Sequence, residues 1–211
     1  MKKEEIKIYF DQKNYITISF QDLIRIPLAY SYVSITFKGE GCGNLLIAHD
    51  IPLLSGLKSF DNSFEKLMRQ KLELTFDTQK DIGYLWNEVM HNVQAGSATW
   101  LGISYMLFST SHGPTTWIYT KHNKIYFEIT PSYPWHFRMN KRPRKAISYE
   151  VFMRNYRSLA QVTLSHEQAH NFLAEVKNWL NRVRKNTWPN EHFCDEHEGE
   201  GCPLISPHKN K

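Results

Sequence analysis

Residues 166–170 have the types and spacing of a hydrolytic metal site. They match the pattern HExxH, with His166 and His170 four positions apart and Glu167 between them. On a helix, two such histidines present ring nitrogens to one zinc ion, and the glutamate acts as general base toward the metal-bound water. In this interpretation His166 and His170 are metal ligands and Glu167 is catalytic.

The sequence around this motif favours a non-catalytic interpretation. Ser165 and Gln168 match a capping box, which places both histidines near the start of a helix. The helix has an apolar stripe, with His166 beside it and His170 further round; the stripe is Ala169, Phe172, Leu173, Val176, Leu180 and Val183. No third ligand follows at a standard spacing. We therefore favour surface histidines without a cofactor and keep a zinc-dependent hydrolase as the alternative.

A second set of metal-type side chains lies close to the C-terminus. It consists of His192, Cys194, His197 and Cys202, a spacing that matches no standard zinc finger. The surrounding acidic residues and glycines are typical of a flexible end. We expect one α+β domain over residues 1–185 and a flexible acidic tail over 186–211, with a zinc site in the tail as a weaker alternative.

Aromatic and basic residues follow one another in the middle of the chain. Trp, Tyr and Arg are enriched where protein interfaces concentrate their binding energy. We therefore predict a protein-contact surface formed by Tyr133, Trp135, Phe137, Arg138, Lys141, Arg142 and Arg144. The opposing interpretation is that these aromatic rings close the core. Nucleic-acid binding through residues 138–145 is a second alternative, which we disfavour because no base-stacking motif accompanies the cluster.

Composition indicates where such a protein works. The chain has 211 residues, a formal net charge of +5 and three cysteines, which argues against a disulfide framework. Its apolar runs are too short to span a bilayer, and its N-terminus lacks the apolar core of a signal peptide. We expect a cytoplasmic protein that does not enter the membrane.

The elements that position these residues are predicted to form an α+β fold with a mainly antiparallel sheet. Alternating segments 6–10 and 15–20 flank a polar turn, and segments 31–37 and 45–47 flank a glycine cluster. Helical spacing over 59–71 and 77–93 predicts a central helical section. A largely apolar strand at 100–108, interior to its sheet, precedes a hairpin at 116–129. Two helices, at 148–160 and 165–184, follow.

The segment from about 100 to 184 resembles small cytoplasmic proteins encoded in bacterial toxin–immunity loci. The resemblance rests on a strand pair, a Pro/aromatic segment and two helices: 117–119 with 124–129, 131–135, the row Tyr149, Phe152 and Tyr156, and 165–179. It implies an α+β binding module that occludes the active site of a toxin and catalyses nothing. Members that neutralise nucleases are frequently acidic. This basic chain departs from that pattern, so the resemblance does not favour a nuclease partner.

Overall fold

A computed structural model describes residues 5–21, 28–74, 80–92, 103–109, 113–134 and 147–187. Within these ranges the chain forms two four-stranded antiparallel sheets and four α-helices. The predicted α+β class with N-terminal hairpins is confirmed. None of the helices in this part of the chain combines the length and apolar character that crossing a membrane requires.

Sheet 1 is a meander of β1 (Glu5–Tyr9), β2 (Tyr15–Phe20), β3 (Tyr32–Gly39) and β4 (Gly43–Pro52). Each of the first three strands buries every second residue, as the alternation in the sequence predicts. The Asp11 carboxylate closes the first turn by accepting from the backbone N–H groups of Lys13 and Asn14, each at 2.8 Å. Positive φ angles at Gly41 (80°) and Gly43 (67°) shape the turn between β3 and β4.

Sheet 2 contains β5 (Met106–Ser109), β6 (Thr115–Lys121), β7 (Lys124–Thr130) and β8 (Ala160–Leu164) in that spatial order. The predicted 116–129 hairpin is confirmed, with Lys121 paired to Lys124. Its two turn residues, His122 and Asn123, have φ angles of 49° and 59°. Two consecutive positive φ angles are typical of the two-residue hairpin turn whose twist matches its strands.

Two sequence predictions in this region are wrong. The apolar run at 100–108 was expected to be an interior strand, but β5 is an edge strand that follows the short 3₁₀ helix η2 (Ile103–Tyr105); residues 100–102 lie outside the described ranges. The helix expected over 148–160 is α3 (Tyr149–Arg154), and its last residue instead starts β8. Burial of Val162 and Leu164 between exposed neighbours shows the period of two that decides for a strand.

The central helices are α1 (Leu53–Met68) and α2 (Ile82–Asn92). Helix α1 begins six residues earlier than the expected start at 59, directly after Pro52, because Leu53 and Leu57 continue the face that Phe60 and Phe64 bury. Helix α2 agrees with the second predicted helix within its described part. A further 3₁₀ helix, η1 (Leu28–Tyr30), precedes β3.

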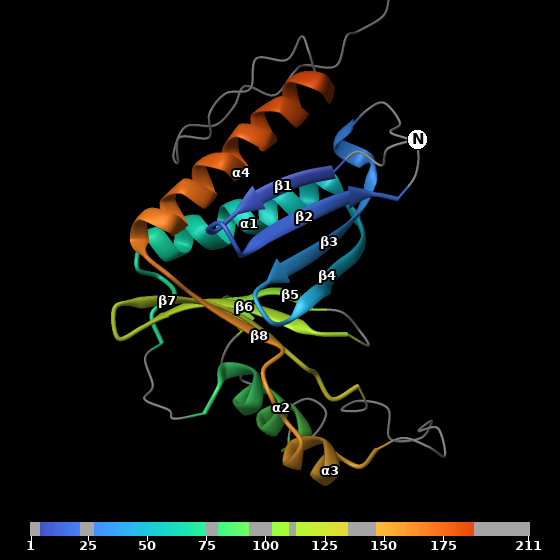
Figure 1. Ribbon diagram of the computed structural model, residues 1–211, viewed down its shortest axis with the longest axis vertical. Coiled ribbons are helices and arrows are strands. Elements are labelled where there is room, and N and C mark those ends of the chain that lie inside the picture. The colour runs from blue at the N-terminus through green and yellow to red at the C-terminus, as the bar shows by residue number, and fades with distance from the viewer. Residues whose placement is uncertain are drawn as a thin grey trace, which may run out of the picture.

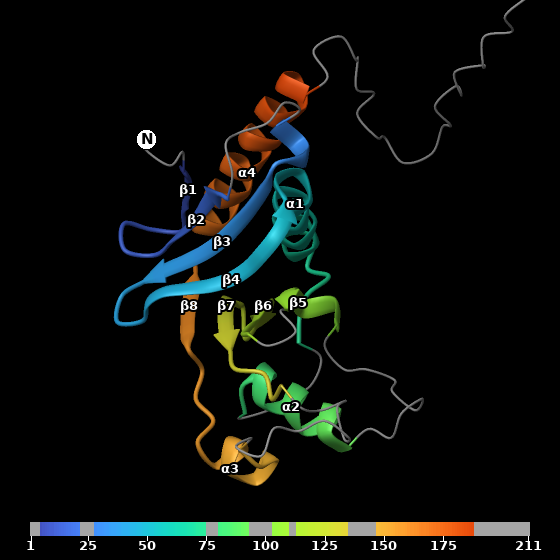
Figure 2. The same cartoon turned by 90° about the vertical axis from the view of Figure 1, so that its right-hand side faces the viewer.

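The elements are arranged around sheet 2, which separates two layers. Helix α1 and the last helix, α4 (His166–Thr187), pack against each other and against sheet 1 on one side, whereas α2 and α3 lie on the other side (Figures 1 and 2). Strands β6 and β7 are therefore covered on both faces, and residues 115–119 of β6 are all buried.

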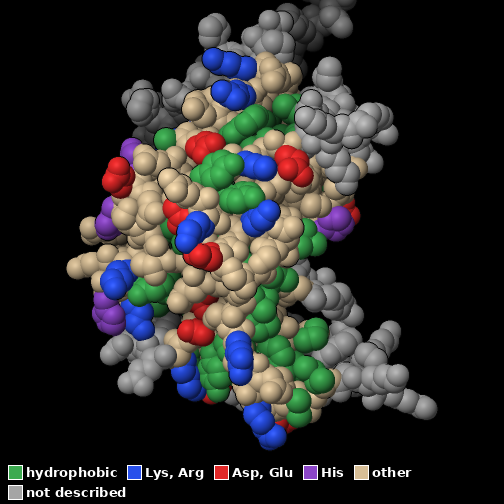
Figure 3. All heavy atoms as spheres, in the orientation of Figure 1, with side chains coloured by type: hydrophobic (Ala, Val, Ile, Leu, Met, Phe, Trp, Pro, Cys, Tyr) green, Lys and Arg blue, Asp and Glu red, His purple; other side chains and the backbone are tan. Residues whose placement is uncertain are grey.

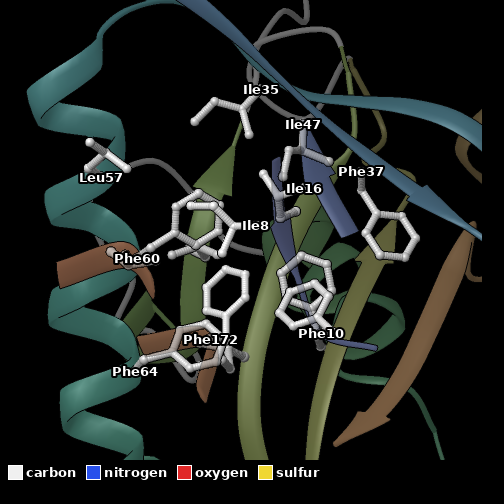
Figure 4. Close-up of a cluster of buried hydrophobic side chains, with 14 of the residues drawn as sticks. Ile8, Phe10, Ile16, Ile35, Phe37, Ile47, Leu57, Phe60, Phe64 and Phe172 are labelled. Atoms are coloured by element: carbon white, nitrogen blue, oxygen red, sulfur yellow. The ribbon is translucent and has the colours of Figure 1, made fainter. Parts of the chain in front are cut away.

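Phenylalanine rings join sheet 1, sheet 2 and both long helices in one core (Figure 4). The ring of Phe10 stacks on that of Phe172 from α4 at a centroid distance of 4.4 Å and lies 4.9 Å from Phe127 of β7. Phe64 of α1 stacks on Phe172 at 4.5 Å. Because these rings come from the β1–β2 turn, α1, α4 and β7, the cluster ties the upper layer, formed by sheet 1, α1 and α4, to sheet 2.

Replacing Phe172 with alanine should lower the free energy of unfolding by about 3–5 kcal/mol, because the cavity removes contacts to several elements at once. Urea denaturation followed by circular dichroism measures this. His170→Ala on the same helix is the matched control, since His170 is exposed, and it should change the value by less than about 0.5 kcal/mol. Equal losses in the two variants would contradict the assignment of the core.

Candidate functional site

The HExxH motif lies at the exposed start of α4. The backbone N–H of Ser165 donates to Gln168 Oε1 at 2.8 Å, and the backbone N–H of Gln168 donates to Ser165 Oγ at 3.1 Å, so the predicted capping box is confirmed. His166, Glu167 and His170 are all exposed. The predicted apolar stripe of α4 is buried along its whole length. The motif therefore lies on the exposed surface of a helix whose opposite side packs into the core.

These two histidines do not gather a ligand set within the described residues. No group of three or more His, Cys, Asp or Glu side chains placed to hold a metal ion occurs in that part of the chain. A catalytic zinc site uses three protein ligands and a shielded cavity. The tail candidates His192, Cys194, His197 and Cys202 lie outside the described ranges.

Zinc analysis of the purified protein tests the motif directly. We expect His170→Ala to leave the zinc content unchanged, because two exposed nitrogens supply only part of a tetrahedral ligand set. The measurement is elemental analysis after dialysis of both proteins. Stoichiometric zinc that the substitution abolishes would establish a metal site at His166 and His170. Zinc held equally by both proteins would point to the tail.

The predicted aromatic and basic surface is described only at its first residue. Trp135, Phe137, Arg138, Lys141, Arg142 and Arg144 lie outside the described ranges. Tyr133 is 2% exposed, and its ring packs against Tyr149 at 5.5 Å and Phe152 at 5.4 Å. Its hydroxyl donates to the carbonyl of Ile147 at 3.2 Å. Tyr133 therefore closes the layer beneath sheet 2, as the opposing interpretation proposed.

Asn87 holds α2 against the chain that leaves β7. Its fully buried side chain donates to the carbonyls of Gly83 at 2.7 Å and Pro131 at 3.0 Å, and it accepts from the Tyr133 backbone N–H at 2.7 Å. Helix and sheet approach closely here, because a Cβ on Gly83 would collide with the side chain of Thr130. Asn87 thus holds Pro131 and Tyr133, which precede the basic residues in the chain, against α2.

Helix α3 presents apolar side chains to solvent. It buries none of its residues, and Ile147, Val151 and Leu159 in and around it are 52%, 41% and 40% exposed. Val151 and Arg154 lie three positions apart and so share a face of the helix. We call Ile147, Val151, Arg154, Arg157 and Leu159 the α3 surface; Figure 3 shows apolar side chains gathered at this end of the molecule with basic ones among them.

The other face of α3 packs against α2 through aromatic rings. The Tyr149 ring stacks on the His91 imidazole at a centroid distance of 3.5 Å, and its hydroxyl donates to the Asn87 carbonyl. Tyr156, seven positions further along, meets the ring of Tyr84 edge-on at 5.3 Å. These contacts orient α3 so that its aliphatic and arginine side chains remain outside.

A buried polar cluster anchors the segment between α3 and β8. Glu128 of β7 is fully buried, and Tyr119 of β6 donates its hydroxyl to Glu128 Oε2 at 2.7 Å. Ser158 Oγ lies 2.8 Å from Glu128 Oε1 and 2.9 Å from Asp81 Oδ2. Asp81 immediately precedes α2, so one serine connects the sheet, the start of α2 and the chain leaving α3.

The electrostatics of this cluster favour the protonated forms of Glu128 and of the tyrosines beside it. Burial raises the pKa of Glu128 to about 7, against the lowering effect of the hydrogen bonds from Tyr119 and Ser158, and the charge of Asp81 adds to the increase. Burial likewise raises the pKa of the Tyr119 and Tyr156 hydroxyls far above the usual value. A carboxyl with a pKa near 7 has the repertoire of a general acid or base, but this one has no exposed surface through which to meet a substrate.

The free energy of unfolding should depend on this carboxyl. The folded chain keeps the Glu128 proton up to pH 7, whereas the unfolded chain loses it near the ordinary value of 4.5. The stabilisation is therefore complete below pH 4.5 and is lost by about 1.4 kcal/mol per pH unit as the pH rises through this window. Urea titrations at several pH values, compared between wild type and Glu128→Gln, should show this slope as their difference. Parallel curves would contradict it.

The sequence analysis missed the polar residues that organise this layer. Glu128 stands in the otherwise largely apolar segment 125–129, and Asn87 stands on the buried face of α2. For Asn87, a lone polar residue on the buried face of a helix was the signal. Alternation places Glu128 on the face of β7 opposite to Ile125, Phe127 and Ile129, so its burial depends on the α2–α3 layer that covers that face. Ser158 carried no such signal, because only the path of the chain between α3 and β8 brings it to two carboxyl groups.

Comparison with known proteins adds no relative. The chain matches no protein-family model, no curated protein and no solved structure.

Proposed function

We propose that this chain is a non-catalytic module that binds another protein through the α3 surface and the basic segment 138–145 that precedes it. The observation that carries the proposal is the exposure of Ile147, Val151 and Leu159 around a short helix that buries no residue. Exposed aliphatic side chains of this kind, interspersed with arginine, are typical of protein contact surfaces.

Charge indicates the chemistry of the partner. From residue 138 to residue 157 the only acidic residue is Glu150, whereas the basic residues are Arg138, Lys141, Arg142, Arg144, Lys145, Arg154 and Arg157. A protein surface with acidic residues around an apolar centre complements this composition. In the setting that the resemblance implies, the partner is a toxin whose active site is covered on binding.

The described aromatic residues favour a protein over a nucleic acid as partner. Single-stranded nucleic acids bind where exposed rings offer faces on which bases stack. Around α3 the rings of Tyr149 and Tyr156 are instead turned to α2, where they contact His91 and Tyr84. Among the described residues around α3, the side chains left outside are aliphatic and basic; they can contact phosphates but offer no ring face on which a base could stack.

Binding to proteins encoded beside this chain's gene tests the proposal. We expect one of them to bind in isothermal titration calorimetry, and Val151→Asp to weaken the affinity at least about 30-fold, since a like-charged carboxylate would face an acidic surface and disrupt its apolar centre. Leu46→Asp on β4 is the matched control, because Leu46 is similarly exposed at 46% but lies on sheet 1.

Three outcomes would count against this function. Equal loss of affinity in both variants would show that the α3 surface is not the contact. Absence of binding to every neighbouring gene product would contradict the proposal that the partner is a toxin encoded beside this chain. Affinity for a labelled oligonucleotide that falls steeply with salt and needs Arg142 or Arg144 would support the nucleic-acid alternative instead.

A further inference from the structure

Ser158 lies between two carboxyl groups, and its single hydroxyl hydrogen cannot satisfy both of them. Its Oγ atom is within hydrogen-bond distance of Glu128 Oε1 (2.8 Å) and of Asp81 Oδ2 (2.9 Å). A serine hydroxyl has one proton and can donate to only one carboxylate at a time. If both carboxyl groups were ionised, the second contact would bring two acceptor oxygens together without a hydrogen between them.

One proton on Glu128 satisfies every contact in the cluster. The protonated carboxyl donates to Ser158 Oγ, Ser158 donates to Asp81 Oδ2, and Tyr119 donates to Glu128 Oε2. Glu128 is the group that holds this proton because it is fully buried, whereas Asp81 is partly exposed. The start of α2 also suits the negative charge of Asp81, since the N-terminal end of a helix is electropositive.

The other groups around Glu128 offer it little compensation for a negative charge. From sheet 2 it is faced by the hydroxyl of Tyr119, with Tyr126 behind it. From the α3–β8 segment it is faced by Tyr156, whose buried hydroxyl interacts with Thr130 and Ser158 and carries no positive charge. From the residue that precedes α2 it is faced by Asp81. The adjacent Lys80 directs its ammonium to Glu88, at 3.3 Å, and over the ring of Tyr84.

We propose that Glu128, Ser158 and Asp81 form a proton-controlled latch, in which loss of the Glu128 proton releases the segment 155–159 from sheet 2 and from the start of α2. Ionisation leaves a buried carboxylate opposite a second one, and local opening hydrates both. The segment 155–159 directly follows α3, so opening also frees one end of the α3 surface; any effect on partner binding rests on the proposed function, whereas the latch itself does not.

The neutral range is where this latch would operate. Burial raises the pKa of Glu128 to about 7 in the closed state, while an opened, hydrated carboxyl has its ordinary value of 4.5. The equilibrium constant for opening should therefore rise about tenfold per pH unit between 4.5 and 7 and level off above 7.

The backbone amide of Leu159 is a built-in reporter of the latch. Its N–H donates to the carbonyl of Ile129 in β7 at 2.8 Å, so it exchanges with solvent only when the segment leaves the sheet. Hydrogen exchange followed by NMR at pH 5, 6, 7 and 8, corrected for intrinsic exchange rates, gives the opening constant at each pH. We expect the tenfold rise per unit up to pH 7 and, at each pH, faster opening at Leu159 than at Ile118 in the centre of the β6–β7 hairpin.

Two substitutions separate the proton from the fold. Glu128→Gln mimics the protonated acid, because its amide can donate to Ser158 and accept from Tyr119, so the opening constant should become independent of pH. In Asp81→Asn, the new amide donates a hydrogen bond to Ser158, which can then donate to an ionised Glu128. The opening constant should therefore stop rising well below pH 7. Either variant suffices if the other fails to fold.

Three results would overturn the latch. The first is an opening constant at Leu159 equal to that at Ile118 at every pH, which would mean that proton loss acts only through global unfolding. The second is an unchanged pH dependence in Glu128→Gln. The third is a rise that continues to pH 7 in Asp81→Asn as it does in wild type. None of these measurements involves a partner, so failure of the proposed function leaves them unaffected.

Discussion

Burial of the β6–β7 hairpin on both faces is the constraint on which the rest of the molecule depends. Successive residues of β7 point to opposite layers: the Phe127 ring joins the phenylalanine core, and the Glu128 carboxyl joins the polar cluster. Every element packs against one of these two faces or against an element that does. One face of the hairpin therefore packs against the phenylalanine core, and the other face packs against the α2–α3 layer.

The two faces of this hairpin are stabilised by different kinds of interaction. The upper face is stabilised by burial of interlocking rings, which is non-directional and tolerates small shifts of the helices. The lower face relies on directed contacts, among them those of Asn87 and Ser158, and each loses its value when one partner moves or changes its protonation state. The α2–α3 layer is consequently a part of the described chain where a change of protonation can act on structure.

This division bears on how the chain would work as a binding module. The phenylalanine core gives a rigid support, and the polar layer sets the orientation of α3. We assign the exposed side chains of Val151 on this helix and of Ile147 just before it to partner contact. A contact surface held by hydrogen bonds rather than by a deep apolar face can adjust without loss of the core. The HExxH histidines lie on α4, on the other side of sheet 2 from α3, so the two candidate sites draw on separate layers (Figure 1).

Local patterns in the sequence were sufficient to predict the sheet-1 hairpins, the 116–129 hairpin, the amphipathic stripe of α4 and its capping box, because each depends on residues within a few positions of one another. Longer-range packing decided what those patterns could not: the edge position of β5, the strand at 160–164, the burial of Tyr133 and the meeting of Glu128, Ser158 and Asp81. The physical reason is that burial and hydrogen-bond partners are properties of a residue's neighbours in space. Asp81 and Ser158 are 77 positions apart in the chain, and only the folding of both onto the same face of sheet 2 brings them within hydrogen-bond distance.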